Sequence, residues 1–218
     1  SPTSRNVLAT GTIVDVAAYN RKLLSPADVP KTWEDFLRPQ HRGRKIIVDI
    51  RPNSLAGLFP AMGKEWVLDY ARKLAAQEPV WVRGRTRALT SLAAGEYPLF
   101  LGTYYHAAMR LKRRGAADLE VILLEPVPVR ITETYGVVKG ARHSRAALLF
   151  LEYATGSEGQ RILDDVEPLK SSIFSPDSKL EQLVRGRKTS VIDWDHVEKQ
   201  GDYMEQVFKA YGMPRGEK

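Results

Sequence analysis

The stretch GTYYH at residues 102–106 carries the clearest chemistry in this sequence. It follows a strand-like apolar run at 98–101 and precedes a helical pattern at 107–115. Ligands often contact such strand-to-helix junctions in α/β proteins. A phenolate is a hard oxygen ligand suited to Fe(III), and phenols also stack on organic ligands and hydrogen-bond to them. Tyr104 and Tyr105 are therefore candidate metal or ligand contacts, with packing of one or both rings in the core as the alternative.

Two further strand ends carry polar residues that favour an anion. Asn53 and Ser54 lie at a helix start, where free N–H groups and the helix dipole attract negative charge, although an ordinary N-cap explains them equally well. In RGRTR (83–87), Arg85 offers a guanidinium that suits a carboxylate or phosphate, with plain surface charge as the alternative. Thr103 completes this set of candidate ligand-binding residues.

The elements that position these residues alternate between strand and helix. From 45 to 125 the pattern predicts an α/β domain with a largely parallel sheet, whose carboxyl strand ends meet at one edge. The predicted strands are 12–20, 45–50, 80–84, 98–103, 119–127 and 129–140. The predicted helices are 31–37, 53–77, 86–96, 105–115, 144–156, one that begins at Ser157, 175–186, and one after Asp195. A break is predicted at Pro60 in the second of these helices. The predicted N-caps are Thr86, Ser144 and Ser175, and Ser157 with Gln160 is predicted to form a capping box.

Composition and motifs limit the classes of function. The chain has 218 residues, a net charge of +7 and no cysteine, which excludes disulfides and thiolate metal sites. The basic groups at 38–45, 82–87 and 110–115 would suit an anionic partner, but no nucleic-acid-binding motif accompanies them, so nucleic-acid binding is not predicted. His106 and the other histidines are scattered, and GxSxG, P-loop and GxGxxG motifs do not occur. We therefore predict a protein that is not an enzyme.

Three phrases together resemble the type 2 extracellular solute-binding proteins of ABC importers. They are the passage from AAYN to RKIIVDI (17–50), the passage from LAAGEYPLFLGTYY to VILLEP (91–126), and GVVKGARHSRAALLFLEYATGSEGQRIL (136–163). The resemblance covers about residues 12–165 and is specific only in combination. It implies a periplasmic-binding-protein type 2 fold, a location in the periplasm or outside the cell, and delivery of a captured solute to an ABC permease.

Within this superfamily, adjacent tyrosines resemble the ferric-ion-binding branch. That resemblance implies Fe(III) held by Tyr104 and Tyr105, with a synergistic anion near Asn53, Ser54 and Leu55, although SLAG replaces the family's small-residue turn. Binding of a small organic solute of the thiamine, polyamine or sugar-derivative type is the alternative, and a ligand-sensing regulatory domain is another. No resident cofactor is expected apart from possible bound Fe(III).

The resemblance also predicts how the chain divides. Residues 1–19 are expected to form a crossover strand and a remnant of lobe 1, residues 20–130 the α/β ligand-binding lobe 2, and residues 131–218 the return crossover and C-terminal helices of lobe 1. Tyr19 and Tyr135 lie on the two crossovers and are expected to be structural. The N-terminal segment of lobe 1 is expected to be missing, which would leave apolar surface for a homodimer.

Overall fold

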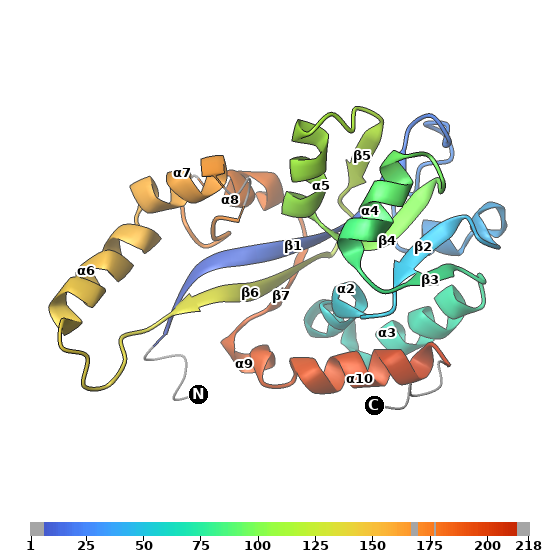
Figure 1. The fold of residues 1–218 in the computed structure, drawn as a ribbon. Coiled ribbons are helices and arrows are strands. Elements are labelled where there is room, and N and C mark those ends of the chain that lie inside the picture. The colour runs from blue at the N-terminus through green and yellow to red at the C-terminus, as the bar shows by residue number, and fades with distance from the viewer. Residues whose placement is uncertain (1–6, 167–169, 177, 213–218) are drawn as a thin grey trace.

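The computed structural model describes residues 7–166, 170–176 and 178–212 (Figure 1). The strands are β1 (Leu8–Asn20), β2 (Ile46–Asp49), β3 (Val80–Val82), β4 (Leu99–Tyr104), β5 (Leu119–Ile122), β6 (Val127–Tyr135) and β7 (Thr189–Ile192). The helices are α2 (Asn53–Ala56), α3 (Phe59–Ala75), α4 (Arg85–Ala93), α5 (Tyr105–Arg113), α6 (Ser144–Thr155), α7 (Ser157–Val166), α8 (Lys179–Val184), α9 (Trp194–Val197) and α10 (Gln200–Ala210), with two 3-10 turns, η1 (Glu34–Leu37) and η2 (Pro39–His41).

A single long strand, β1, joins the two parts of the sheet. Strands run in the order β3-β2-β4-β1-β6-β7, and β5 also pairs with β1. β2 is parallel to β3 and β4, as the sequence predicts for this region, whereas β1 is antiparallel to β4, β5 and β6. The first half of β1 pairs with β6 and the second half with β4 and β5. The junction between these halves lies at Val14 and Asp15.

Helices cover both faces of the β3-β2-β4 sheet. One core cluster, including Phe36, Ile46 and Leu74, packs between the sheet and α3. A second cluster, including Ile47, Leu92 and Phe100, packs under α4 and α5. Strands buried on both faces read as continuous apolar runs, which explains why IIV in β2 and LFL in β4 lack alternation.

The structure corrects several predicted helix boundaries. The predicted break of the 53–77 helix near Pro60 is confirmed, because α2 ends at Ala56 and α3 begins at Phe59, with this proline in the first turn of α3, where its missing N–H has no helical partner to lose. The chain also departs from helical geometry at Gly63, whose φ of 75° favours a residue without a Cβ. Caps by Thr86, Ser144 and Ser175 are wrong. Ser178 caps α8 by accepting from the Glu181 N–H, and Asp193 caps α9.

The SEGQ motif has a structural role at the turn between α6 and α7. A Cβ on Gly159 would collide with the carbonyl oxygen of Tyr153, so this position requires glycine. Gln160 does not form the predicted capping box. Its buried side chain donates to the carbonyls of Thr10 and Ala154 and accepts from the Ser172 N–H, which ties α7 to β1.

The C-terminal helices divide between two regions of the molecule. In Figure 1, α6 and α7 lie at the left, beside the β1–β6 ribbon, whereas α10 lies below α3. Phe59 stacks on Tyr203 at 4.3 Å, and Trp81 packs against Tyr211 at 4.6 Å between ring centroids. These contacts join α10 to the predicted lobe 2. The predicted division into lobes at residues 19 and 130 stays a prediction. Helix α10, which was assigned to lobe 1, packs against residues of the predicted lobe 2.

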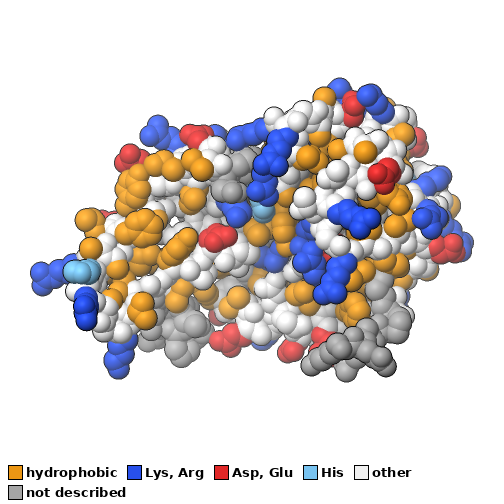
Figure 2. Space-filling model, viewed as in Figure 1, with side chains coloured by type: hydrophobic (Ala, Val, Ile, Leu, Met, Phe, Trp, Pro, Cys, Tyr) orange, Lys and Arg blue, Asp and Glu red, His pale blue; other side chains and the backbone are white. Residues whose placement is uncertain are grey.

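The surface of α6 exposes large apolar side chains. Leu148, Leu149 and Phe150 are each more than half exposed. Figure 2 shows hydrophobic atoms gathered over this end of the molecule. The sequence-based expectation of an uncovered apolar surface applies to this face, but no finding supports the predicted homodimer.

Candidate functional site

Tyr104 lies at the carboxyl end of β4, with two arginines over its ring. It is the last residue of β4, immediately precedes α5 and is partly exposed. The guanidinium carbon of Arg85 lies 4.0 Å from the ring centroid, and that of Arg130 lies 5.2 Å from it. The His106 ring stacks on Tyr104 with 5.5 Å between centroids. Such contacts of cations with an aromatic ring hold all four side chains in one cluster.

Arg85 enters this cluster from the first residue of α4. Gly84 precedes it with a φ of 117°, a conformation that lets the chain turn sharply from β3 into the helix. The Arg85 Nε donates to the carbonyl oxygen of Gly102 at 2.9 Å and lies 3.4 Å from Asp49 Oδ2. Arg85 is 8% exposed, so the predicted surface-charge alternative is wrong for this residue.

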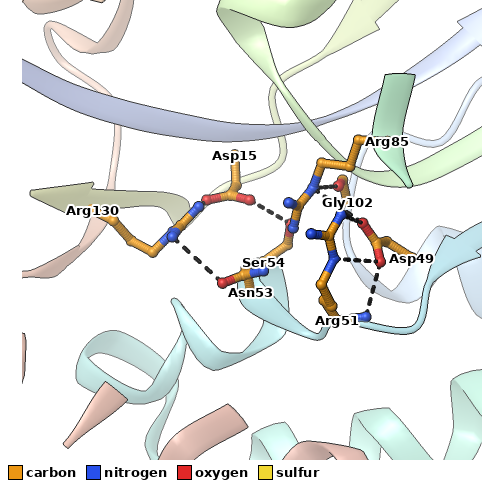
Figure 3. A network of polar contacts seen from close by, with 8 residues as sticks. All are labelled: Asp15, Asp49, Arg51, Asn53, Ser54, Arg85, Gly102 and Arg130. Carbon is orange, nitrogen blue, oxygen red and sulfur yellow. Dashed lines mark hydrogen bonds and ion pairs between the residues drawn. The ribbon is translucent and has the colours of Figure 1, made fainter. Parts of the chain in front are cut away.

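Arg130 enters from β6 and is held by a buried network (Figure 3). Its Nε donates to Asp15 Oδ2 at 3.0 Å, and its Nη1 approaches Asn53 Oδ1 at 3.5 Å. Ser54 Oγ donates to Asp15 Oδ1 at 2.8 Å. Arg130 is opposite Ile13 in the β1–β6 ladder, and Asp15 lies two residues along β1 on the same face. The network therefore links both long strands to α2.

Asn53 and Ser54 do not cap α2, contrary to the N-cap alternative. The N-cap residue is Pro52, without a side-chain cap hydrogen bond. Both polar side chains are buried and bond to the charged groups of Arg130 and Asp15 instead. A buried charge requires hydrogen-bond partners, which explains why the network takes up both side chains.

A second carboxylate, Asp49, holds two arginines at the other end of the site. It lies at the end of β2 and is buried. Arg51 pairs with it at 3.1 Å and Arg85 at 3.4 Å. The hydrogen bond that Arg51 donates to Asp49 raises the pKa of the Arg51 guanidinium, and the nearby Tyr104 phenol contributes in the same direction. Two guanidinium groups thus lie over the Tyr104 ring, and a third, that of Arg51, pairs with Asp49.

The two neighbours of Tyr104 in the sequence, Thr103 and Tyr105, differ in burial. Tyr105 packs partly against an apolar cluster that includes Val16 and Val127, and burial raises the pKa of its phenol. Thr103 is fully buried, and its Oγ1 has no hydrogen-bond partner among the described residues. The roles of all these residues in ligand binding, and of Tyr104 and Tyr105 as metal ligands, stay predictions.

His106 is a neutral imidazole beside Tyr104. Burial lowers its pKa to about 4, and the nearby charges of Lys170, Arg110, Arg130 and Arg85 act in the same direction. At neutral pH the ring therefore adds no charge to the site. It is buried under the phenol, which gives it a positioning role toward Tyr104.

Sequence reasoning missed Asp15, Arg130 and Asp49 as parts of this site. The sequence does contain an indication of Asp15 and Arg130, because each is a charged residue within an otherwise apolar strand segment, TIVDVAAY or VPVRI. A charge at such a position is buried unless the strand lies at a surface, and a buried charge needs a partner. Their pairing depends on the register of β1 against β6, which the sequence does not reveal.

The cavities of the described residues lie mostly away from Tyr104. A small cavity of about 10 Å³ lies beside Arg51 and Ser54. A larger one of about 370 Å³ lies between β6, α6 and α7, where Tyr135, Phe150 and Tyr153 line it. Within the described ranges, no three His, Asp or Glu side chains gather to hold a metal ion. None of the described helices has the length and hydrophobicity that crossing a bilayer requires.

A fold of this kind, with long strands passing between two regions and polar residues at the carboxyl strand ends, defines a periplasmic-type binding protein of type 2. Residues 2–200 match the family described as bacterial extracellular solute-binding protein, and the chain therefore belongs to that family. The resemblance predicted from sequence is confirmed. A Haemophilus influenzae protein described as uncharacterized is 29% identical in an alignment of 146 positions, which covers 62% of this chain and 40% of that relative.

Solved structures share the fold at low sequence identity. Iron-bound HitA from Pseudomonas aeruginosa matches 95% of this chain with a TM-score of 0.71 and 17% identity. Trichodesmium IdiA (FutA), in complex with iron and citrate, matches 94% with a TM-score of 0.74 and 18% identity. AfuA from Actinobacillus pleuropneumoniae, with fructose-6-phosphate bound, matches 94% with a TM-score of 0.64 and 20% identity. The chain covers 70%, 69% and 67% of these structures, respectively.

Proposed function

We propose that this chain is the solute-capturing part of an ABC importer, without a catalytic role. It binds a small solute at Tyr104 and delivers it to a membrane permease from the periplasm or the cell exterior. The family and the fold support the transport role. The single observation that supports the location of the site is the convergence of Arg85 and Arg130 on a partly exposed phenol at a carboxyl strand end.

Fe(III) is one candidate solute, with Tyr104 and Tyr105 as phenolate ligands. Both side chains are partly exposed, and they follow each other at the start of α5. The iron named in the HitA and IdiA structures supports this candidate. Because guanidinium groups lie over Tyr104, the ferric ion requires an accompanying anion here.

Ferric phenolate absorbs visible light, which provides the test. Titration of the chain with Fe(III) in the presence of citrate is expected to produce a visible band that Tyr104→Phe and Tyr105→Phe each remove. Tyr97→Phe is the matched control, because Tyr97 packs against the second core cluster away from the site. A band that survives both site substitutions would exclude tyrosine ligation.

A small organic solute is the second candidate. The arginines around Tyr104 favour a solute with negative charge over a polyamine, which like charge would repel. The fructose-6-phosphate in the AfuA structure supports a phosphorylated sugar derivative. Native mass spectrometry of the chain produced in its own host is the direct test. A bound organic solute that Tyr104→Ala abolishes supports this candidate, whereas bound iron supports the first.

A further inference from the structure

Two buried arginines in the site keep unused hydrogen-bond donors. Arg85 is 8% exposed and Arg130 is 6% exposed. The Nη2 atom of each has no hydrogen-bond partner among the described residues. A buried, unpaired donor is unfavourable, and one on a charged group is more so. Such a donor in a native protein requires an explanation, and a bound ligand, ion or water would provide one.

Both guanidinium groups are fixed in place through their other nitrogens. The Arg85 Nε is held by the Gly102 carbonyl and Asp49, and the Arg130 Nε is held by Asp15. Because these bonds use Nε, and Nη1 in Arg130, the Nη2 atoms remain for a ligand. Figure 3 shows the two arginines entering the region around Ser54 from opposite sides. They are preorganised donors and require little reordering on binding.

The charges that surround these arginines also favour an anion. Arg51, Arg85 and Arg130 face Asp15 and Asp49, which leaves one positive charge in excess. Lys170 and Arg110 lie close enough to influence His106, but Lys170 pairs with Glu133 at 3.7 Å, so neither is counted in this excess. Inside a site of low dielectric constant, such an excess strengthens binding of a negatively charged group.

We propose that Arg85 and Arg130 form an oxyanion subsite for the carboxylate or phosphoryl group of an organic solute. This inference rests on the proposed solute-binding function and names the class of solute. The Tyr104 ring lies over both guanidinium carbons, so it turns aside to admit the oxyanion and then packs against the organic part of the solute. Planar guanidinium groups match carboxylate and phosphoryl oxygens through paired hydrogen bonds.

Binding of metal-free probes tests the subsite. Acetate, inorganic phosphate and phenyl phosphate are titrated separately into the full chain, and binding is measured by calorimetry. Comparison of acetate with phosphate distinguishes a carboxylate from a phosphoryl group, and comparison of phosphate with phenyl phosphate distinguishes a free ion from an organic ester. We expect at least one probe to bind. Arg85→Gln and Arg130→Lys are expected to weaken it by about tenfold, or about 1.4 kcal/mol. Arg87→Gln, an equal charge change on an exposed residue of the same helix, is expected to change it by less than about twofold.

The variants need a check of folding, since both arginines pair with buried carboxylates. Thermal melts provide it, and Arg85→Lys replaces Arg85→Gln if the latter does not fold. Arg85→Lys keeps the charge and removes the planar fork, so it is also expected to weaken binding.

Two results would overturn the subsite. One is that no metal-free probe binds to the folded chain. The other is that Arg87→Gln weakens binding as much as Arg85→Gln, which would indicate general attraction to the basic surface. If phosphate binds only together with Fe(III), with a visible band that needs Tyr104, the subsite is wrong and the proposed function stands. If no metal-free probe binds, the iron titration gives no band and native mass spectrometry finds no solute, the subsite and the proposed function both fail.

Discussion

Asp15 is expected to be the residue of the site whose loss destabilises the fold most. Its carboxylate is fully buried and accepts hydrogen bonds from Arg130 and Ser54. Asp15→Ala leaves the Arg130 guanidinium buried without its counter-ion. In the native chain burial lowers the pKa of Arg130, and the charge of Asp15 and the Tyr104 phenol raise it overall. A guanidinium does not lose its proton inside proteins, so Arg130 stays charged in the variant as well.

The magnitude follows from the loss of one partner of a buried ion pair. Such a change costs about 3–5 kcal/mol, mainly because the remaining charge stays in a poorly solvated place. The Ser54 hydroxyl also loses its acceptor, but it can rotate toward another partner. The expected loss of stability therefore includes no contribution from Ser54. For a chain of this size, each kcal/mol lowers the melting temperature by about 2–4 °C. Asp15→Ala is therefore expected to melt about 6–20 °C below the wild-type chain.

Thermal and urea unfolding followed by circular dichroism measure this effect. The control is Asp118→Ala, which removes a carboxylate that pairs with exposed Arg21 and Lys22 and is expected to cost less than about 1 kcal/mol. The pair Asp15→Leu with Arg130→Met is expected to recover much of the loss, because no charge remains buried. A loss for Asp15→Ala no larger than that for Asp118→Ala would refute the buried ion pair.

Three further predictions concern the surroundings of the site. The folded-state pKa of His106, about 4, lies below its ordinary 6.5, so the unfolded chain binds the proton first as pH falls. Stability should decrease from about pH 6.5 toward pH 4, by about 2 kcal/mol near pH 5, and urea unfolding of His106→Gln should lack this part of the decrease. Tyr211→Ala should cost about 3–5 kcal/mol in thermal unfolding, because it removes a buried ring packed on Trp81. Leu149→Ala, at an exposed position of α6, should cost less than about 0.5 kcal/mol, and equal losses would contradict the docking of α10. Gly159→Ala should destabilise the chain by more than about 1 kcal/mol, since its Cβ meets the Tyr153 carbonyl, and a neutral result in a urea melt would show that the turn can relax.

Local sequence patterns predicted most elements that surround the site. The apolar run before Tyr104 forms β4, and the helical pattern after it forms α5 with cations in its last turn. β7 was missed, because TSVI is short and does not alternate between apolar and polar residues. Its parallel pairing with β6, rather than its own composition, stabilises it.

The sequence alone indicated the strand end with the two tyrosines, the excess of positive charge and the solute-binding family. These features depend on residue type and on spacing within one or two elements. Only the tertiary structure brought Arg130 to Tyr104 and Asp15, because residues 115 positions apart meet through the register of β1 against β6. Long-range register depends on packing across the whole sheet, which no local pattern contains. For the same reason, the sequence suggested Asn53 and Ser54 as possible helix caps, whereas in the fold their side chains hydrogen-bond to the buried charged groups of Arg130 and Asp15.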